Sequence, residues 1–215
     1  MRVYHFLSAQ YALKNLYEHR MKISTVTDLN DPFELLCFNL ENMCDREGFA
    51  TAIEEFSRRF GVLCFSRSWS NPLLWAHYSD KHKGICLGFD VLLDDALKEV
   101  ILTRERLPAP QCREDFNDAL AQQWLFTKFE DWRYEDEVRV FADLNDKEGD
   151  LYFYDFDEHI QLREVIVGVK CSVQKSAIER ALRNYQTSIE IIKARLSPDC
   201  FEVIADISFS QCSRA

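Results

Sequence analysis

The apolar residues of this chain recur with two spacings, one typical of helices and the other of strands. Four segments place apolar side chains three or four positions apart, as on one face of a helix. A fifth begins with Pro72, a residue favoured at the first helical position, and Ser8 stands where a helix N-cap is favoured. We predict helices at 8–19, 46–60, 72–79 and 174–185, and a long helix that carries Phe116, Leu120 and Trp124 on one face and ends near Trp132.

Between these segments lie short apolar runs bounded by polar, Gly or Pro residues, as is typical of strands. We predict strands at 3–7, 22–25, 62–66, 84–89, 99–103, 137–142, 151–156, 163–169, 189–194 and 201–207. Strands and helices are mixed without a regular βαβ rhythm, so we expect an α+β fold with a mixed, mainly antiparallel sheet and flanking helices. No repeat and no Gly/Ser-rich linker divides the chain, which predicts a single domain over 1–215.

The composition narrows the class of protein. Of the 215 residues, 47% are hydrophobic and 13% aromatic, which is enough for a substantial core. The net charge of −10 argues against binding bulk duplex nucleic acid, because that binding needs a broad basic surface. No apolar run is long enough to span a membrane, and the N-terminus does not resemble a signal peptide. The eight cysteines lie far apart without a CxxC pair, so we expect reduced thiols, a cytoplasmic protein and no metal site.

Three stretches hold most of the candidate chemistry. They are NDPFE (30–34), CFSRSWSNPLLWAHYSDKHKGICLGF (64–89) and WRYEDEVRV (132–140). Polar and aromatic residues crowd these stretches where a plain core would use aliphatic ones. Such crowding is typical of residues that line a site for a small molecule or a nucleotide.

The first stretch has two interpretations. Asn and Asp bond to their own backbone in turns and Pro fixes φ, so NDPFE can be simply a rigid loop. In the functional interpretation, Asn30, Asp31 and Glu34 present polar groups at the mouth of a cleft, with Phe33 as an apolar anchor. The two interpretations are compatible.

The second stretch places Trp75, Tyr78 and Ser79 on one face of its short helix, with His77 beside them. His77 and His82 are five positions apart, which does not bring them together as metal ligands. A half-buried, hydrogen-bonded role for His77 competes with a role in binding a substrate.

The third stretch is the most specific. If 135–141 is extended, Glu135, Glu137 and Arg139 share one face, while Val138 and Val140 point to the core. Glu137 and Arg139 can form a structural ion pair. Alternatively, the arginine holds a carboxylate ionised so that it can stabilise positive charge in a transition state.

These stretches and their order resemble a known family. An N-terminal YHF strand, then LNDPFE, CFS…NPLLWAHYSDKHKGICLGF, YEDEVR and a late IVGV segment are similar to the bacterial domain-of-unknown-function 2971 family, over about residues 4–170. The resemblance implies a stand-alone bacterial cytoplasmic protein, with a link to phage defence. It implies no particular activity.

A second resemblance is to the ADP-ribosyltransferase-like fold, which runs strand–helix–strand at its N-terminus and carries a late glutamate. It implies that His5, Tyr78 and Glu137 are catalytic, with Glu135 two positions before Glu137 in an ExE spacing. The implied reaction cleaves the nicotinamide–ribose bond of NAD, which is a substrate rather than a cofactor. Its oxocarbenium-like transition state resembles that of glycoside hydrolysis. Asn30, Asp31, Glu34, Trp75, His77, Glu135 and Arg139 are the candidate substrate-binding residues.

Two alternatives belong to other classes. A metal-assisted phosphodiesterase or nuclease would use Asp31, Glu34, Glu135 and Glu137. A non-catalytic sensor or interaction module would use Trp69, Trp75 and Trp132 for packing or for binding a partner. The transferase hypothesis requires His5, Tyr78, Glu137 and Arg139 to converge on one pocket.

Overall fold

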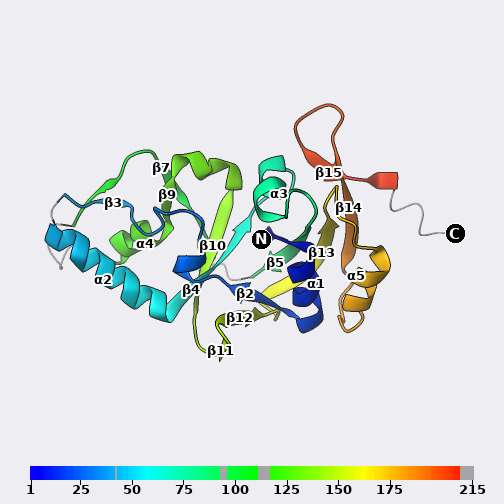
Figure 1. The fold of residues 1–215 in the computed structure, drawn as a ribbon, viewed down its shortest axis with the longest axis horizontal. Coiled ribbons are helices and arrows are strands. Elements are labelled where there is room, and N and C mark those ends of the chain that lie inside the picture. The colour runs from blue at the N-terminus through cyan, green and yellow to red at the C-terminus, as the bar shows by residue number, and fades with distance from the viewer. Residues whose placement is uncertain (42, 93–95, 111–116, 209–215) are drawn as a thin grey trace.

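The centre of the protein is one large sheet with helices on both faces (Figure 1). The structure is a computed structural model and describes residues 1–41, 43–92, 96–110 and 117–208. Eight strands form the sheet in the order β15-β14-β13-β5-β1-β4-β10-β6. Their bounds are β1 (Arg2–Leu7), β4 (Phe60–Ser66), β5 (Ile85–Val91), β6 (Lys98–Glu99), β10 (Glu137–Asp143), β13 (Ile160–Val167), β14 (Glu190–Leu196) and β15 (Val203–Ala205). Strands β13 and β14 are parallel and their neighbours pair antiparallel, so the predicted α+β class is confirmed.

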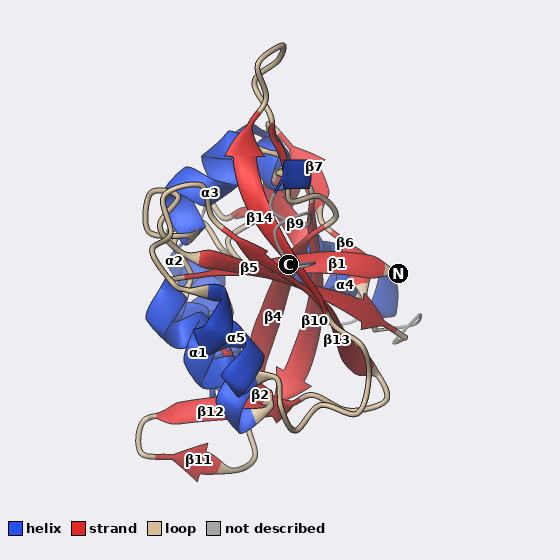
Figure 2. Cartoon of the chain, turned by 90° about the vertical axis from the view of Figure 1, so that its right-hand side faces the viewer, coloured by secondary structure: helices blue, strands red, loops and turns tan. Residues whose placement is uncertain are grey.

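The helices divide the core between the two faces of the sheet. They are α1 (Ala9–Glu18), α2 (Met43–Arg59), α3 (Pro72–Tyr78), α4 (Asp118–Phe126) and α5 (Lys175–Ala181). Helices α1 and α5 lie side by side over one face and bury Leu16 and Ile178 against Leu87 (Figure 2). Helix α3 covers the other face and buries Leu74 and Trp75. A third cluster joins α2 to α4 at the far end of the molecule, on the left of Figure 1.

Short strand pairs surround the large sheet. Strand β2 (Arg20–Ile23) pairs with β12 (Leu151–Asp155), which also pairs with β11 (Lys147–Glu148). The other two pairs are parallel, and they join β3 (Phe38–Asn39) to β8 (Leu107–Pro108) and β7 (Ile101–Thr103) to β9 (Thr127–Phe129).

The large sheet forks between β1 and β4. Strand β1 pairs with β5 from Arg2 to Leu7, but it meets β4 at Tyr4–Ser66. Beyond that point β4 continues along β10, and Figure 2 shows β4 and β10 running steeply across the direction of β1 and β5. We call this place, where the two pairs of strands part, the fork. The two arms of the fork leave room between them that an evenly paired sheet would not have.

Local sequence accounts for several boundaries that were predicted. The Ser8 side chain accepts a hydrogen bond from the backbone of Tyr11 and caps α1, and Asn71 caps α3 directly before Pro72. Strand β10 buries Val138 and Val140 on the α1 side of the sheet, as its alternation predicted.

The predicted long helix that ends near Trp132 is wrong. Helix α4 ends at Phe126, and the chain continues as strand β9 and then as a 3-10 helix, Glu130–Glu135. Pairing with β7 satisfies backbone groups that a longer helix would have used internally, and it overrides the helical spacing of the aromatic residues. Phe116 lies outside the described residues.

Two further predictions need correction. The strand predicted at 99–103 is two strands, β6 and β7, which belong to different sheets. Glu135 is not in an extended strand, because it ends the 3-10 helix and Asp136 follows in the left-handed region with φ 46°. None of the helices in the described residues has the length and apolar character needed to cross a membrane.

Candidate functional site

A pocket of about 110 Å³ lies at the fork of the large sheet. Three consecutive residues from each arm line it, residues 4–6 of β1 and residues 64–66 of β4. The remaining lining comes from the loop after β2, from α3, from β9, from the 3-10 helix Glu130–Glu135 and from the start of β10. These residues are Leu29, Asn30, Glu34, Leu74, Tyr78, Lys128, Glu135, Glu137 and Arg139.

Seven polar side chains around this pocket form one connected hydrogen-bonded network. We call it the polar network, and its members in order are Asn30, Tyr78, Glu135, Lys128, Glu137, Arg139 and Glu34. Its two end members, Asn30 and Glu34, both lie in the NDPFE loop, so this loop connects the two ends of the network. All three polar-aromatic stretches of the sequence therefore meet at this pocket.

Arg139 and Lys128 are the cations of the polar network. Arg139 is 1% exposed and holds Glu137 with two hydrogen bonds, of 2.8 Å from Nε and 3.0 Å from Nη2. Its Nη1 donates to Glu34 at 2.5 Å. Lys128 Nζ donates to Glu137 at 2.7 Å and also to Glu135. Each cation is thus shared between two carboxylates, which satisfies the rule that buried charges are paired.

The two glutamates that share Lys128 differ in pKa. Burial alone would raise the pKa of Glu137, but the charges of Arg139 and Lys128 outweigh burial and lower it to about 2. Burial is also the largest influence on Glu135, and there it prevails over Lys128 and raises the pKa. Glu137 is therefore held ionised, while Glu135 takes up a proton more readily. Such a pair of unlike carboxyl groups is common in sites of acid–base chemistry.

Tyr78 connects the polar network to the loop. Its hydroxyl donates to Glu135 and accepts a hydrogen bond of 2.7 Å from Asn30 Nδ2. Burial and the bond to Glu135 raise the pKa of Tyr78, which keeps the phenol protonated and a donor. Tyr78 is the last residue of α3, so the cap at Asn71 and the buried Trp75 fix its position.

His5 reaches the pocket from the other face of the sheet. The strand register aligns Tyr4 with Ser66 and Ser66 with Glu137, so these three residues share one face of the sheet. His5 follows Tyr4 on β1 and therefore points to the opposite face, with Val3 and Leu7. Its ring meets Phe65 edge-on at 5.8 Å.

The His5 imidazole bridges the two arms of the fork. Its Nδ1 lies 3.0 Å from the Cys64 carbonyl, an arrangement in which Nδ1 carries the proton and donates. Burial lowers the pKa of His5, so the ring is neutral. His5 lines the same pocket as Tyr78, Glu137 and Arg139. Its side chain, however, lies on the face of the sheet opposite Glu137 and is engaged in holding β1 to β4, so the geometry does not support the catalytic role that the resemblance implied for His5.

Tight turns shape the NDPFE loop. Asp31 is buried and accepts a hydrogen bond of 2.9 Å from the backbone of Phe33, which braces the turn. Leu35 follows in the left-handed region with φ 60°, a costly conformation for a residue with a large side chain. The indole of Trp124 donates to the Leu35 carbonyl at 2.8 Å and holds it there. Glu34 is thereby fixed against Arg139.

Three candidate binding residues do not reach the pocket. Asp31 is occupied in its turn, as described above. Trp75 is fully buried between α3 and the sheet, where its Nε1 donates to the Trp69 carbonyl at 2.6 Å. His77 is exposed and faces the rings of Tyr78 and Tyr134 from outside the pocket. Trp75 is a core residue, and the structure gives neither His77 nor Asp31 contact with a molecule in the pocket.

Lys128, Tyr4 and Ser66 line the pocket and were missing from the sequence-based candidates. Lys128 was hidden because the long-helix prediction covered it. The segment Phe126–Phe129 places one lysine between aromatic residues. That pattern could have identified Lys128 as a candidate. Tyr4 follows from the strand alternation once the register with β4 is known.

The carboxylates of the polar network do not form a metal centre. Among the described residues there is no group of three or more His, Cys, Asp or Glu side chains that could hold a metal ion. Lys128 and Arg139 take the positions between the carboxylates, so a bound ion would have to displace a buried cation of the protein.

Comparison of the chain with protein-family models, with curated proteins and with solved structures finds no match. The resemblances to the domain-of-unknown-function 2971 family and to the ADP-ribosyltransferase-like fold therefore stay predictions that depend on the sequence motifs.

Proposed function

We propose that this chain is an ADP-ribosyltransferase-like enzyme that cleaves the N-glycosidic bond of NAD or of a related nucleotide at the fork. The observation that carries the proposal is the charge of the polar network. Three carboxylates, Glu34, Glu135 and Glu137, share two cations, Lys128 and Arg139. With all of them ionised the network has a surplus of one negative charge beside the pocket.

That surplus suits a reaction that develops positive charge. When the bond from ribose C1′ to the nicotinamide nitrogen breaks, its electron pair leaves with nicotinamide, and C1′ becomes oxocarbenium-like. A preorganised carboxylate in a water-poor site stabilises such a cation without rearranging. The pKa of Glu137, lowered to about 2, keeps its charge in place throughout.

One of the hydrogen-bond partners of Glu137 is a weak donor that a substrate hydroxyl could replace. A carboxylate offers about four lone-pair positions. Arg139 Nε uses one on Oε1, and Arg139 Nη2 and Lys128 use two on Oε2. The Cys64 thiol also interacts with this carboxylate through a side-chain hydrogen bond. A ribose hydroxyl that donates to Glu137 would take the place of this weak donor.

The other residues then have separate roles in the proposal. Glu135, with its raised pKa, would take the proton that water or an acceptor hydroxyl loses when it attacks C1′. Tyr78 would fix Glu135 and offer its ring to the nicotinamide. His5 would be a positioning residue that keeps the fork at its width. Cysteines 37, 64, 86, 171 and 200 are free thiols, as the proposed cytoplasmic location would require.

The proposal is tested by incubating the purified chain with NAD and measuring nicotinamide by chromatography. We expect release by the wild type and a loss of at least about a hundredfold in Glu137→Gln, the scale found when one electrostatic group of a site is removed. The variant should fold, because Glu34 still neutralises Arg139 and Glu135 still neutralises Lys128.

The matched control is Glu164→Gln, which removes another arginine-paired glutamate of the same sheet outside the pocket. It should release nicotinamide at the wild-type rate. A wild type that releases none, or a Glu137→Gln variant as active as the wild type, would refute the catalytic assignment. Wild-type protein that is inert with NAD but recovers a protein partner would favour the interaction-module alternative.

A further inference from the structure

A second, larger cavity adjoins the polar network on the other side of β9. It has a volume of about 310 Å³, at the lower end of the roughly 300–1,000 Å³ typical of ligand pockets. Strand β9 separates it from the fork. Thr127 and Phe129 point to one face of this strand and Lys128 points to the other, toward Glu135 and Glu137.

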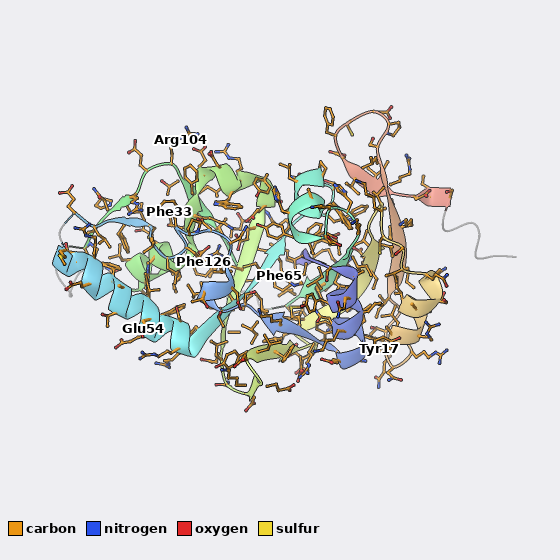
Figure 3. The ribbon with its side chains drawn as sticks, in the orientation of Figure 1. Tyr17, Phe33, Glu54, Phe65, Arg104 and Phe126 are labelled. Atoms are coloured by element: carbon orange, nitrogen blue, oxygen red, sulfur yellow. The ribbon has the colours of Figure 1, made fainter. Side chains whose placement is uncertain are left out.

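Carbon atoms make up most of the lining of this cavity, and its rim carries aromatic rings. The lining residues are Phe33, Leu36, Cys37, Thr103, Arg104, Glu105, Arg106, Thr127, Lys128 and Phe129. Phe33 is 55% exposed and Phe129 is 41% exposed, although both are large apolar residues. Figure 3 shows Phe33 and Arg104 at the same end of the molecule, far from Tyr17 on α1. Two exposed aromatic rings beside an apolar cavity suit a planar ring.

The two arginines of the rim differ in whether a carboxylate neutralises them. Arg104 is already neutralised, with Nε 3.0 Å from Glu130 and Nη2 4.0 Å from Asp131. Arg106 has no carboxylate partner among the described residues, and its guanidinium lies 5.3 Å from the centre of the Phe33 ring. Glu105 contributes a carboxylate to the rim, but its side chain is solvated. Arg106 is therefore the cation that remains available to an anionic group.

One buried polar atom points to a ligand independently. Thr127 is 4% exposed, and its Oγ1 has no hydrogen-bond partner among the described residues. A buried hydroxyl without a partner costs free energy, and nearly all such groups in native proteins are satisfied. Oγ1 itself is covered in the free protein, but Thr127 lines the cavity. A rotation of its side chain would bring the hydroxyl to a ring nitrogen or an exocyclic group of a bound molecule.

We infer that this cavity binds a nucleoside monophosphate. Its base would lie against Phe33 and Phe129 with a hydrogen bond from Thr127, and its phosphate would lie at Arg106. This inference depends on the cavity alone and not on the proposed cleavage of NAD.

The test is equilibrium dialysis of the full chain with radiolabelled AMP and, in parallel, with adenosine. We expect saturable binding of AMP and at least about tenfold weaker binding of adenosine, because a charge-assisted hydrogen bond to phosphate is lost. Arg106→Gln should weaken AMP binding by a similar factor. Arg104→Gln, which removes the neutralised arginine of the same rim, is the matched control and should change AMP affinity less than about threefold.

Thr127→Val separates a ligand contact from a packing role. Replacing the unpartnered hydroxyl by a methyl group should raise the melting temperature of the free protein and still weaken AMP binding. Failure of AMP to bind at millimolar concentration, equal affinities for AMP and adenosine, or an Arg106→Gln variant that binds like the wild type would each overturn the inference. Glu137→Gln should bind AMP normally, so AMP binding without nicotinamide release would refute only the proposed function.

Discussion

Two clusters of paired charges contain residues of the large sheet and differ mainly in burial. In the polar network, the side chains of Glu34, Lys128, Glu135, Glu137 and Arg139 are between 1% and 7% exposed. In the second cluster, the side chains of Arg2, Asp90, Arg163 and Glu164 on β1, β5 and β13 are between 16% and 35% exposed. Both clusters pair arginines with carboxylates, and the polar network adds Lys128. The polar network is almost fully buried, whereas the second cluster stays partly hydrated.

Burial changes what such a cluster contributes. Removing an ion from water costs several kcal/mol, and a buried pair often does no more than recover that cost. A solvated pair contributes roughly 0–1 kcal/mol. Neither cluster is therefore an efficient way to stabilise the sheet. The buried one, with its surplus carboxylate beside a pocket, has a stronger claim to a chemical role.

The largest expected effect comes from removing the central cation of each cluster. Arg139→Met leaves Glu34 without a cation, while Glu137 keeps its ion pair with Lys128. This substitution should lower the free energy of unfolding by about 3–5 kcal/mol. Arg2→Met in the solvated cluster should lower it by about 1 kcal/mol or less, because water can replace the lost contacts. Urea unfolding of both variants measures the difference. Equal losses would show that burial does not distinguish the two clusters.

Removing one tyrosine hydroxyl beside each cluster should have a smaller effect on stability. Tyr78→Phe removes a donor to Glu135 and an acceptor for Asn30. It should cost about 1–3 kcal/mol because the Glu135 carboxylate left behind is buried, whereas the exposed Asn30 can bond to water instead. Tyr4→Phe, beside Glu164, should cost less than about 1 kcal/mol. Thermal unfolding of the two variants gives the order of their losses. A larger loss for Tyr4→Phe would contradict the special status of the polar network.

The sequence predicted the sheet better than it predicted the site. Val138 and Val140 alternate with Glu137 and Arg139, and that period fixed which face of β10 is core and which faces the pocket. Helical spacing failed beyond Phe126, where aromatic residues continue at suitable intervals but the backbone pairs with β7 instead. The same error hid Lys128, so the network seemed to hold one cation.

Composition alone could not separate site residues from packing residues. Tyr78 and Trp75 are three positions apart on one short helix, and both are aromatic with a polar atom. Tyr78 reaches the pocket because it ends the helix, whereas Trp75 is covered on all sides. Nor could the alternation of β1 show that His5 and Glu137 point to opposite faces, because that depends on the register of β1 with β4. Register is a property of the assembled sheet.

The smallest effect concerns His5, which bridges the two regions at the fork. Burial lowers the pKa of His5 below its usual value of about 6.5, so the unfolded chain binds a proton there more readily than the folded chain. The contribution of His5 to stability is therefore complete above about pH 6.5 and falls with decreasing pH, by at most about 1.4 kcal/mol per pH unit, until the folded pKa is reached.

His5→Asn keeps a donor for the Cys64 carbonyl but does not titrate. The stability of the wild type relative to this variant should decline between about pH 7 and about pH 5, and urea unfolding across that range measures it. A constant difference would mean that the imidazole can take up its proton without leaving the fork, and would remove the reason for treating His5 as a neutral brace between β1 and β4.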